Sequence, residues 1–383
     1  MSPTRRDLLK AAPLAVPLLA GSATAQEAPK KRESFPGFTV RMHEPRNLET
    51  PVQHLGSANT PTSQFYVRSH FAVPKLDAKS WTLKVGGHVE KPRDFSLDDL
   101  KALPTVEKSL LLECAGNGRI FLVPQVRGLQ WAFGGVGQAA WTGIPIAAIL
   151  DLVRPKAGAV EVLLTGADKG PVNSDPPSPG PVAFDRSIPL AKAKRPECLL
   201  AWGMNGAELT PAHGYPLRAV VGGYYGMASI KWLTELTVLD RPYDGFWQTF
   251  DYSYYERIDG KPTLVPVDRV QPKAIISNLG SGSIVPPKAE VRIEGLAWAG
   301  DEVVKSVEFS SDGGRTWSAA KFEKSKPHEW VAWSYDWLTA ETGSFALVAR
   351  CTSGANVVQP DKRDPDRRTY MINHTIPIDV TVA

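Results

Sequence analysis

Cysteine is scarce in this sequence: its 383 residues hold three, Cys114, Cys198 and Cys351. They are too few and too widely spaced for a disulfide-stapled fold or a cysteine zinc site. No Cys-x-x-Cys-His motif for attachment of a c-type haem occurs, so we expect no haem in this chain. Three cysteines can form at most one disulfide, so at least one thiol stays free. The pairing of Cys198 and Cys351 stays open, although both border apolar strand patterns and favour a structural role.

The sequence also lacks a large excess of positive or of negative charge. The 44 basic and 40 acidic residues give a formal net charge of +4, which excludes the strongly basic surface typical of nucleic-acid-binding proteins. No apolar run is long enough to span a membrane. The length exceeds that of one typical core, so we expect two domains. The 33 prolines and 32 glycines favour a loop-rich and sheet-rich fold over a helix bundle.

The first 25 residues have the pattern of an export signal. Arg5, Arg6 and Lys10 precede a short apolar stretch at 11–20, and Ala-Thr-Ala follows at 23–25. This order of charge, apolar centre and small-residue cleavage site is typical of exported proteins, and the paired arginines favour the twin-arginine route. We therefore expect residues 1–25 to be removed and the mature protein to be periplasmic. The alternative is an apolar tail without this role.

The pattern of elements changes near residue 271. Residues 26–64 predict an extended lead-in, and residues 65–270 alternate strand and helix patterns, with short helices at 96–100 and 146–153 and a loop at 168–182. From 271 to 383 successive strand patterns occur, with a hairpin signal at 312–314. The sequence predicts an α+β protein: a mixed α/β domain over 65–270, then an immunoglobulin-like β-sandwich.

A possible site lies where a leucine-rich strand pattern ends in a glycine-rich turn. The turn reads Glu-Cys-Ala-Gly-Asn-Gly-Arg over 113–119, with Cys114 at its tip and Arg119 beyond it. Glycine allows the tight backbone that such a turn needs. A thiolate there can bind a soft metal, and a guanidinium can hold an anion beside it. The alternative is a buried cysteine that packs as a small apolar residue.

This turn resembles the cofactor-ligating loop of the sulfite oxidase family of molybdopterin oxidoreductases, whose cysteine sulfur binds molybdenum. The similarity covers about residues 60 to 360. It implies a single-pterin molybdenum-molybdopterin cofactor with Cys114 as the metal ligand. Arg68 and His70 match an Arg-x-His segment of the family, which implies a substrate-binding arginine and a pterin contact. Ser69 stands where relatives often have asparagine.

Further segments extend the resemblance. The family implies that Trp131 lines the substrate pocket and that Tyr252 is the active-site tyrosine. The pterin and its phosphate would be bound by Asp168, His213, Arg218, Ser229, Ile230 and Lys231. Each position also has an ordinary structural interpretation, as an exposed strand residue, a turn aspartate or a packed tyrosine or tryptophan. For Trp141 we favour a core position, and Tyr254 and Tyr255 remain alternatives to Tyr252.

A third substrate arginine of the animal enzymes has no clear counterpart. It follows a Val-Gln-Pro stretch in those relatives, and the matching stretch here is 358–360. Arg363, Arg367 or Arg368 can take its place, or the pocket has only two arginines.

The resemblance implies a periplasmic sulfite dehydrogenase without haem that oxidises sulfite to sulfate. Arg68 and Arg119 would orient the anion, and Tyr252 would help proton movement. Electrons would pass singly to a periplasmic c-type cytochrome, and the second domain would form a homodimer. The alternatives are a sulfane dehydrogenase of a thiosulfate-oxidising system, a methionine sulfoxide reductase, and an exported binding protein without a cofactor. The arginine pair favours a small oxyanion over a neutral sulfoxide.

Overall fold

The computed structural model describes residues 33–383, except residue 57 and residues 174–176. The expected export signal at residues 1–25 lies outside the described residues. Residues 35–383 belong to one structural unit. No helix within the described ranges is long and apolar enough to cross a bilayer.

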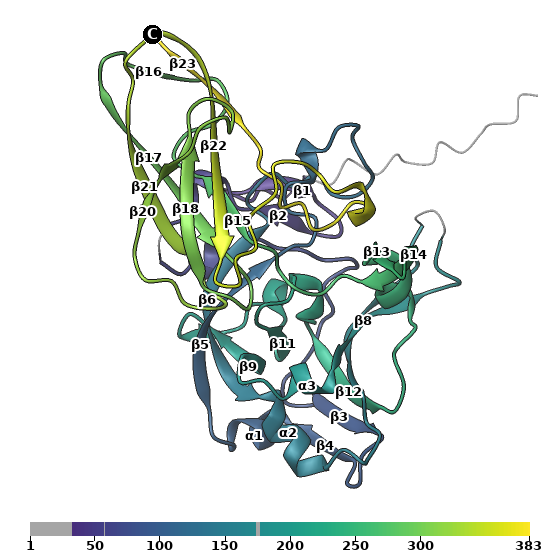
Figure 1. Ribbon diagram of the computed structural model, residues 1–383. Helices are drawn as coiled ribbons and strands as arrows, with labels where there is room; N and C mark the ends of the chain where they lie inside the picture. Colours follow the sequence, from purple (N-terminus) through teal and green to yellow (C-terminus); the bar gives the residue numbers. More distant parts are fainter. Residues whose placement is uncertain (1–32, 57, 174–176) are drawn as a thin grey trace, which may run out of the picture. The chain divides into compact units, whose positions relative to one another are not determined.

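The first domain contains two five-stranded sheets (Figure 1). The first has the order β10-β9-β6-β5, with β11 also paired to β9, and its pairs are antiparallel. Its strands are β5 (Val106–Glu113), β6 (Val136–Pro145), β9 (Cys198–Met204), β10 (Ala207–Glu208) and β11 (Arg218–Val221). The second has the order β4-β3-β12-β7-β8, and only β12 and β3 run parallel. Its strands are β3 (Thr82–Gly87), β4 (Arg93–Ser96), β7 (Glu161–Gly170), β8 (Val182–Pro189) and β12 (Leu233–Leu239).

Helices are short and few among the described residues. The helix predicted near 96–100 is α1 (Leu97–Lys101), and its capping box joins Ser96 to Asp99 as the residue pattern indicates. The helix predicted at 146–153 is α2 (Ile146–Val153), which begins directly after Pro145. The other helical segments are α3 (Leu190–Ala193), the 3-10 helices η1 (Val52–His54), η2 (Thr62–Gln64), η3 (Arg119–Phe121), η4 (Pro211–His213), η5 (Gly226–Ala228) and η7 (Pro365–Arg367), and the π-helix η6 (Phe246–Asp251).

Two sequence predictions of irregular structure differ from the fold. The lead-in contains a hairpin, β1 (Thr39–Met42) with β2 (Asn47–Glu49), and η1 and η2. All three residues of β2 are buried, and Leu48 forms a bridge with Val67, so tertiary contacts order this segment. The loop predicted at 168–182 begins later, because β7 continues to Gly170 and pairs there with β8. Asp168 is therefore a strand residue.

The second domain is a β-sandwich, as predicted. One sheet has the order β15-β17-β21-β20 and the other β16-β23-β22-β18-β19. Its strands are β15 (Lys273–Ile276), β16 (Ser283–Val285), β17 (Glu290–Trp298), β18 (Val304–Ser310), β19 (Ser318–Ala319), β20 (Lys321–Phe322), β21 (Val331–Leu338), β22 (Gly343–Ser353) and β23 (Ile378–Val382). The short strands β19 and β20 belong to different sheets, because β19 pairs with β18 while β20 pairs with β21. The chain crosses there from one sheet to the other.

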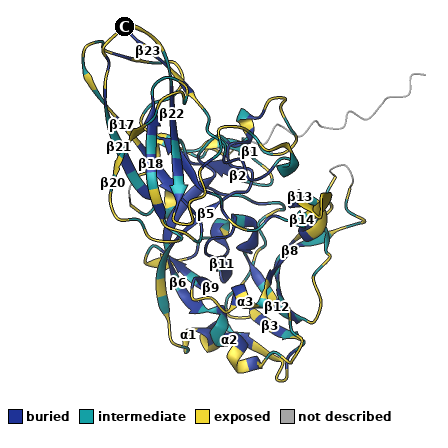
Figure 2. Cartoon of the chain, in the orientation of Figure 1, coloured by how far each residue is buried: buried dark blue, intermediate teal, exposed yellow. Residues whose placement is uncertain are grey.

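Each domain has a core of its own (Figure 2). Leu83, Ile149 and Leu236 are fully buried in the first domain, and Ile293 and Leu347 are fully buried in the sandwich. A third cluster, which includes Cys114 and Trp131, lies beneath the cysteine turn. The remaining hairpin is β13 (Ser253–Ile258) with β14 (Lys261–Pro266), much of which is exposed. The strands that position the site described below belong to these buried clusters, and not to the exposed hairpin.

We expect Gly143→Ala to destabilise the first domain. A Cβ at Gly143 would overlap the carbonyl oxygen of Leu200 on the paired strand β9, and overpacking of this kind costs about 1–3 kcal/mol. Gly86→Ala in β3 is the matched control, since no atom lies within 4 Å of a Cβ there, and its effect should stay within about 0.5 kcal/mol. Denaturant unfolding of both variants measures the difference, and equal midpoints would contradict the expectation.

Candidate functional site

The predicted cysteine turn is present and tightly held. Cys114 follows the last residue of β5, its backbone N–H donates to the Gly135 carbonyl at 2.8 Å, and its carbonyl accepts from the Asn117 N–H at 2.8 Å. A side chain at Gly116 would overlap the Arg119 guanidinium, so glycine is required for this close approach. Burial raises the pKa of the Cys114 thiol, and Arg68 and Arg119 oppose this shift. A bound metal would displace the proton.

Two cavities meet at this thiol. An inner cavity holds about 650 Å³ of empty space, and an outer cleft holds about 1810 Å³. Cys114 lines both, together with Arg68, Ser69, His70 and Tyr252. The structure therefore brings together residues that the sequence separates by 184 positions, and it places Cys114 where a ligand in the inner cavity and a substrate in the cleft can meet.

The inner cavity is lined by buried cations. The Arg218 guanidinium donates to the carbonyls of His213 at 3.0 Å and Ser229 at 3.1 Å, and burial lowers its pKa to about 10. The Lys231 ammonium donates to Ser69 Oγ at 3.0 Å and to the Ala212 carbonyl at 2.9 Å. Within the described part of the chain, neither cation has a carboxylate oxygen within 4.0 Å. Buried positive charge without a counter-ion favours an anionic ligand such as phosphate.

The inner cavity also contains a neutral histidine, His213, and an acid with a raised pKa, Asp168. Burial, with Lys231 and Arg218, lowers the pKa of His213 to about 3, so its ring is neutral. The Nε2–H then donates to the Phe65 carbonyl at 3.3 Å while Nδ1 accepts from the Thr210 hydroxyl at 2.8 Å. Burial raises the pKa of Asp168 to about 6, against the opposing effect of Lys231 and Arg68. These groups can exchange hydrogen bonds with a polar heterocycle.

The stretch 229–231 is divided between cavity and core. Ser229 and Lys231 line the inner cavity, whereas the side chain of Ile230 is fully buried in the core of the first domain. The Ile230 carbonyl accepts from the Ala219 N–H at 2.8 Å. Ile230 therefore fixes the backbone on which its two neighbours are mounted.

The outer cleft contains the two predicted substrate arginines. Arg119 is 5% exposed, and it donates from Nη1 to the Leu129 carbonyl at 2.9 Å and from Nε to the Thr369 carbonyl at 3.1 Å. Arg68 donates from Nη1 to Asn47 Oδ1 at 3.3 Å and to the Ser69 carbonyl. Burial lowers the pKa of Arg68, but Tyr252 and Cys114 outweigh it and the net shift is upward. Both guanidiniums are thus charged and held in place.

Tyr252 lies at the junction of the two cavities, directly after η6. Its hydroxyl is 2.7 Å from His70 Nε2, and burial raises the pKa of Tyr252 to about 12. Burial, with Arg68 and Lys231, lowers the pKa of His70 well below its usual value. A neutral imidazole therefore accepts the hydrogen bond, and the phenol keeps its proton. Tyr254 and Tyr255 lie on β13 and line neither cavity.

The structure corrects the position expected for Trp131. Its side chain is fully buried and lines neither cavity. It packs edge-on against Tyr66, with ring centroids 6.1 Å apart, in the cluster beneath the turn. Trp141 is a core residue as favoured, with Nε1 donating to the Leu110 carbonyl at 3.1 Å. Both tryptophans support the cysteine turn without contacting the cleft.

Of the three candidates for a third arginine, Arg368 lines the cleft. Its Nη1 donates to Ser253 Oγ at 2.7 Å and to the Phe250 carbonyl at 3.0 Å. Arg363 donates to carbonyls of its own loop, including that of Tyr370 at 2.6 Å, and Arg367 to Asn373 Oδ1 at 3.2 Å. Neither Arg363 nor Arg367 lines the cleft.

Sequence reasoning missed two further cleft residues. Tyr370 donates its hydroxyl to Asp251 Oδ1 at 3.1 Å. Its ring centroid lies 4.8 Å from that of Tyr252 and 5.3 Å from the centre of the Arg119 guanidinium. Asp251 directly precedes Tyr252 in the chain, so its position beside a predicted site residue could have indicated that it lines the cleft. Tyr370 lies in the second domain, and nothing in its local sequence indicated it.

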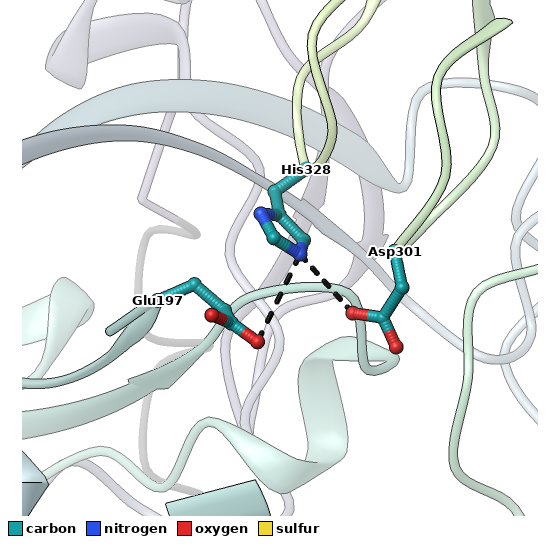
Figure 3. Close-up of side chains that lie close together, drawn as sticks. All are labelled: Glu197, Asp301 and His328. Atoms are coloured by element: carbon teal, nitrogen blue, oxygen red, sulfur yellow. Dashed lines mark hydrogen bonds and ion pairs between the residues drawn. The ribbon is translucent and has the colours of Figure 1, made fainter. Parts of the chain in front are cut away.

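Figure 3 shows a second cluster of possible metal ligands. None of its residues lines either cavity. Donor atoms of Glu197, Asp301 and His328 lie within 4.8 Å of one another. The Lys192 ammonium, however, lies 2.8 Å from Glu197 Oε1 and 2.9 Å from Asp301 Oδ1. This ammonium already supplies the positive charge between the carboxylates, so the cluster is an ion-pair network between the domains. Cys198 and Cys351 are free and fully buried, so the described structure has no disulfide between them.

Two family models match the chain. Residues 70–247 match the oxidoreductase molybdopterin binding domain, and residues 267–380 match the Mo-co oxidoreductase dimerisation domain. The first match contains Cys114, Arg119, Arg218 and Lys231. The second contains Lys273, Arg368 and Tyr370. Together the two models cover most of the described residues.

Relatives with these domains cover most of the chain as well. It is 32% identical to mitochondrial sulfite oxidase of Rattus norvegicus over 350 residues, which is 86% of this chain and 62% of the rat protein. It is 31% identical to sulfite oxidase of Arabidopsis thaliana, with 89% and 91% covered, and 31% identical to nitrate reductase [NADH] 1 of that plant, with 83% and 38% covered. The crystal structure of the sulfane dehydrogenase SoxCD from Paracoccus pantotrophus matches with a TM-score of 0.76 at 25% identity, over 88% of this chain and 87% of that chain.

Asp168 should titrate with a measurable effect on stability in protein purified without a cofactor. A carboxyl whose pKa is raised from 3.8 to about 6 stabilises the fold fully below its unfolded pKa, and this contribution is lost as the pH rises to about 6. Asp168→Asn stays neutral, so its unfolding free energy relative to wild type should increase between about pH 4 and pH 6. His213 acts in the opposite direction in this window, but it is present in both proteins. A difference that does not change with pH would contradict the assignment.

Proposed function

The chain belongs to the sulfite oxidase family of molybdopterin oxidoreductases, and from this premise we propose that it oxidises sulfite to sulfate at a molybdenum centre. The observation that carries the proposal is the position of Cys114. This thiol lies between an inner cavity with buried cations and an outer cleft that presents Arg68 and Arg119. A metal ligand, a site for an anionic cofactor and a site for an anionic substrate thus meet at one sulfur.

The residues of the inner cavity fit a phosphorylated pterin. Arg218 and Lys231 offer buried positive charge for a phosphate, and His70, Asp168 and His213 offer hydrogen-bonding groups for a heterocycle. When bound, the cofactor supplies the two-electron redox chemistry, and Cys114 would complete the coordination of its metal.

The outer cleft determines how a substrate approaches. Arg68 and Arg119 would neutralise a small oxyanion and orient it, because both guanidiniums are held by protein acceptors before the substrate arrives. Arg368 adds positive charge to the same cleft. In the structure the Tyr252 phenol donates its one proton to His70 Nε2, so it would have to release this bond before it could donate a hydrogen bond to the substrate.

The route of the electrons and the location of the protein are part of the proposal. Residues 4–25 support export by the twin-arginine route to the periplasm. No haem-attachment motif occurs in the sequence, so we propose a separate periplasmic c-type cytochrome as the one-electron acceptor. The match of residues 267–380 to a dimerisation domain supports a homodimer.

A sulfane dehydrogenase is the second candidate function. The outer cleft, with about 1810 Å³ of empty space, is larger than a sulfite ion requires. A cleft of this size would also admit a sulfur atom carried on the flexible arm of another protein. The structural likeness to a sulfane dehydrogenase supports the same possibility.

Purified mature protein should contain about one molybdenum per chain and should reduce cytochrome c when sulfite is added. Cys114→Ser should lose the metal, because the hydroxyl is a weaker ligand for a soft metal than a thiolate, and with it the activity. Metal analysis and steady-state assays with sulfite, and with a thiosulfate-loaded carrier protein, measure this. Full metal content and activity in the variant would refute the ligand assignment, and turnover of only the carrier would favour the second function.

Arg68→Ala should weaken sulfite binding while leaving the metal in place. Loss of a charge-assisted hydrogen bond costs about 1.5–3 kcal/mol, which corresponds to an increase in the Michaelis constant of roughly ten- to a hundredfold. Arg292→Ala is the matched control, because Arg292 lies on β17 with its side chain 60% exposed. An unchanged Michaelis constant for Arg68→Ala would remove Arg68 from the substrate site.

A further inference from the structure

The residue before Cys114 carries a carboxylate into the protein interior. The side chains of Glu113 and Lys273 are each 1% exposed, and Lys273 Nζ lies 2.9 Å from Glu113 Oε1. Glu113 ends β5 in the first domain, and Lys273 begins β15 in the second domain. The pair therefore joins two residues 160 positions apart, and it does so beside the proposed metal ligand.

Further hydrogen bonds complete the surroundings of this pair. Trp298 Nε1 donates to Glu113 Oε2 at 2.9 Å, and Asn117 Nδ2 donates to Glu113 Oε1 at 3.0 Å. Lys273 Nζ also donates to the Asn117 carbonyl at 3.0 Å. Both carboxylate oxygens thus have partners, as a buried charge requires, and two of the donors come from the second domain.

These contacts lie on both sides of Cys114. Lys273 binds the turn at residues 113 and 117. Between them, the Ala115 carbonyl accepts from the Met371 N–H, again of the second domain, at 2.8 Å. The second domain thus contacts the turn at the Glu113 side chain and at the carbonyls of Ala115 and Asn117, and these contacts help to fix the backbone that carries Cys114.

We propose that Glu113 and Lys273 are positioning residues that hold Cys114 in its metal-binding position. The second domain is then a structural component of the metal site as well as a candidate dimer interface. The proposal rests on the function proposed above, because it takes Cys114 as the metal ligand. Residues that orient a metal ligand typically change metal affinity ten- to a hundredfold when they are removed.

The chain offers a matched control for general destabilisation. Lys192 forms a second buried ion-pair network between the domains, with Glu197 at 2.8 Å and Asp301 at 2.9 Å. None of these three residues lines either of the cavities that meet at Cys114. Lys192→Met therefore breaks a comparable network at a distance from the cysteine turn.

The test compares Lys273→Met with Lys192→Met in the full-length mature protein purified with its cofactor. Three quantities are measured: molybdenum per chain, the electron paramagnetic resonance spectrum of the singly reduced metal, and the thermal midpoint. We expect both variants to lower the midpoint. Lys273→Met should retain less than about a third of the wild-type molybdenum, consistent with a tenfold loss of affinity, and should shift the resonance spectrum. Lys192→Met should keep the wild-type metal content and spectrum.

A double variant tests whether Lys273→Met changes the metal site only because it misfolds. Glu113→Gln with Lys273→Met leaves no unpaired buried charge, so it should recover most of the thermal midpoint while the spectrum stays shifted. A wild-type spectrum and metal content in the double variant, or equal effects of Lys273→Met and Lys192→Met on the metal, would overturn the proposal. Absence of molybdenum from the wild-type protein would instead refute the proposed function.

Discussion

Positive charge that no carboxylate contacts directly is the constraint on which the first domain depends. Arg218 and Lys231 lie in the interior, and their hydrogen bonds go to carbonyl and hydroxyl oxygens. Such groups cost free energy to bury, and the lowered pKa values of both express that cost. An anionic ligand that binds only the folded state would offset this cost and stabilise the fold by mass action. Cofactor binding and folding of this domain are therefore linked.

Two other buried lysines, Lys192 and Lys273, have carboxylate partners. Lys273 is paired with Glu113, and Lys192 with Glu197 and Asp301, each at 2.9 Å or less. Where buried charge joins the two domains, the protein supplies its own counter-ion. Arg218 and Lys231 differ from these two lysines, because they donate only to carbonyl and hydroxyl oxygens.

The sequence alone was sufficient for the local features of the site. A strand that ends in a glycine-rich turn placed Cys114 and Arg119 correctly, and the capping box at Ser96 and the start of the helix at Ile146 followed from nearby residues. Family resemblance added Arg68 and Lys231, which lie far from Cys114 in sequence but line the same cavity. It failed for Trp131, because whether a tryptophan lines a pocket or the core depends on the packing around it.

Features that depend on the second domain could not be derived from local sequence. Glu113 and Lys273 are 160 residues apart, and each by itself resembles an ordinary surface charge at the end of a strand. Tyr370 and Arg368 reach the cleft only because the segment between β22 and β23 returns to the first domain. Long-range pairings of this kind leave no periodic signal in a sequence, since periodicity reports only which face of an element is buried.

The hydrogen bonds of the cleft arginines bear on how an oxyanion would bind. Arg119 uses Nε and Nη1 for protein carbonyls, and Arg68 uses Nη1 for Asn47 and Ser69. A guanidinium has five N–H donors, so each arginine keeps donors for a ligand while its plane is fixed. Little side-chain entropy is then lost on binding, and the electrostatic field acts from preset positions. Because the same second-domain loop supplies the Thr369 carbonyl to Arg119 and the Met371 N–H to the cysteine turn, the substrate site and the proposed metal ligand share one support.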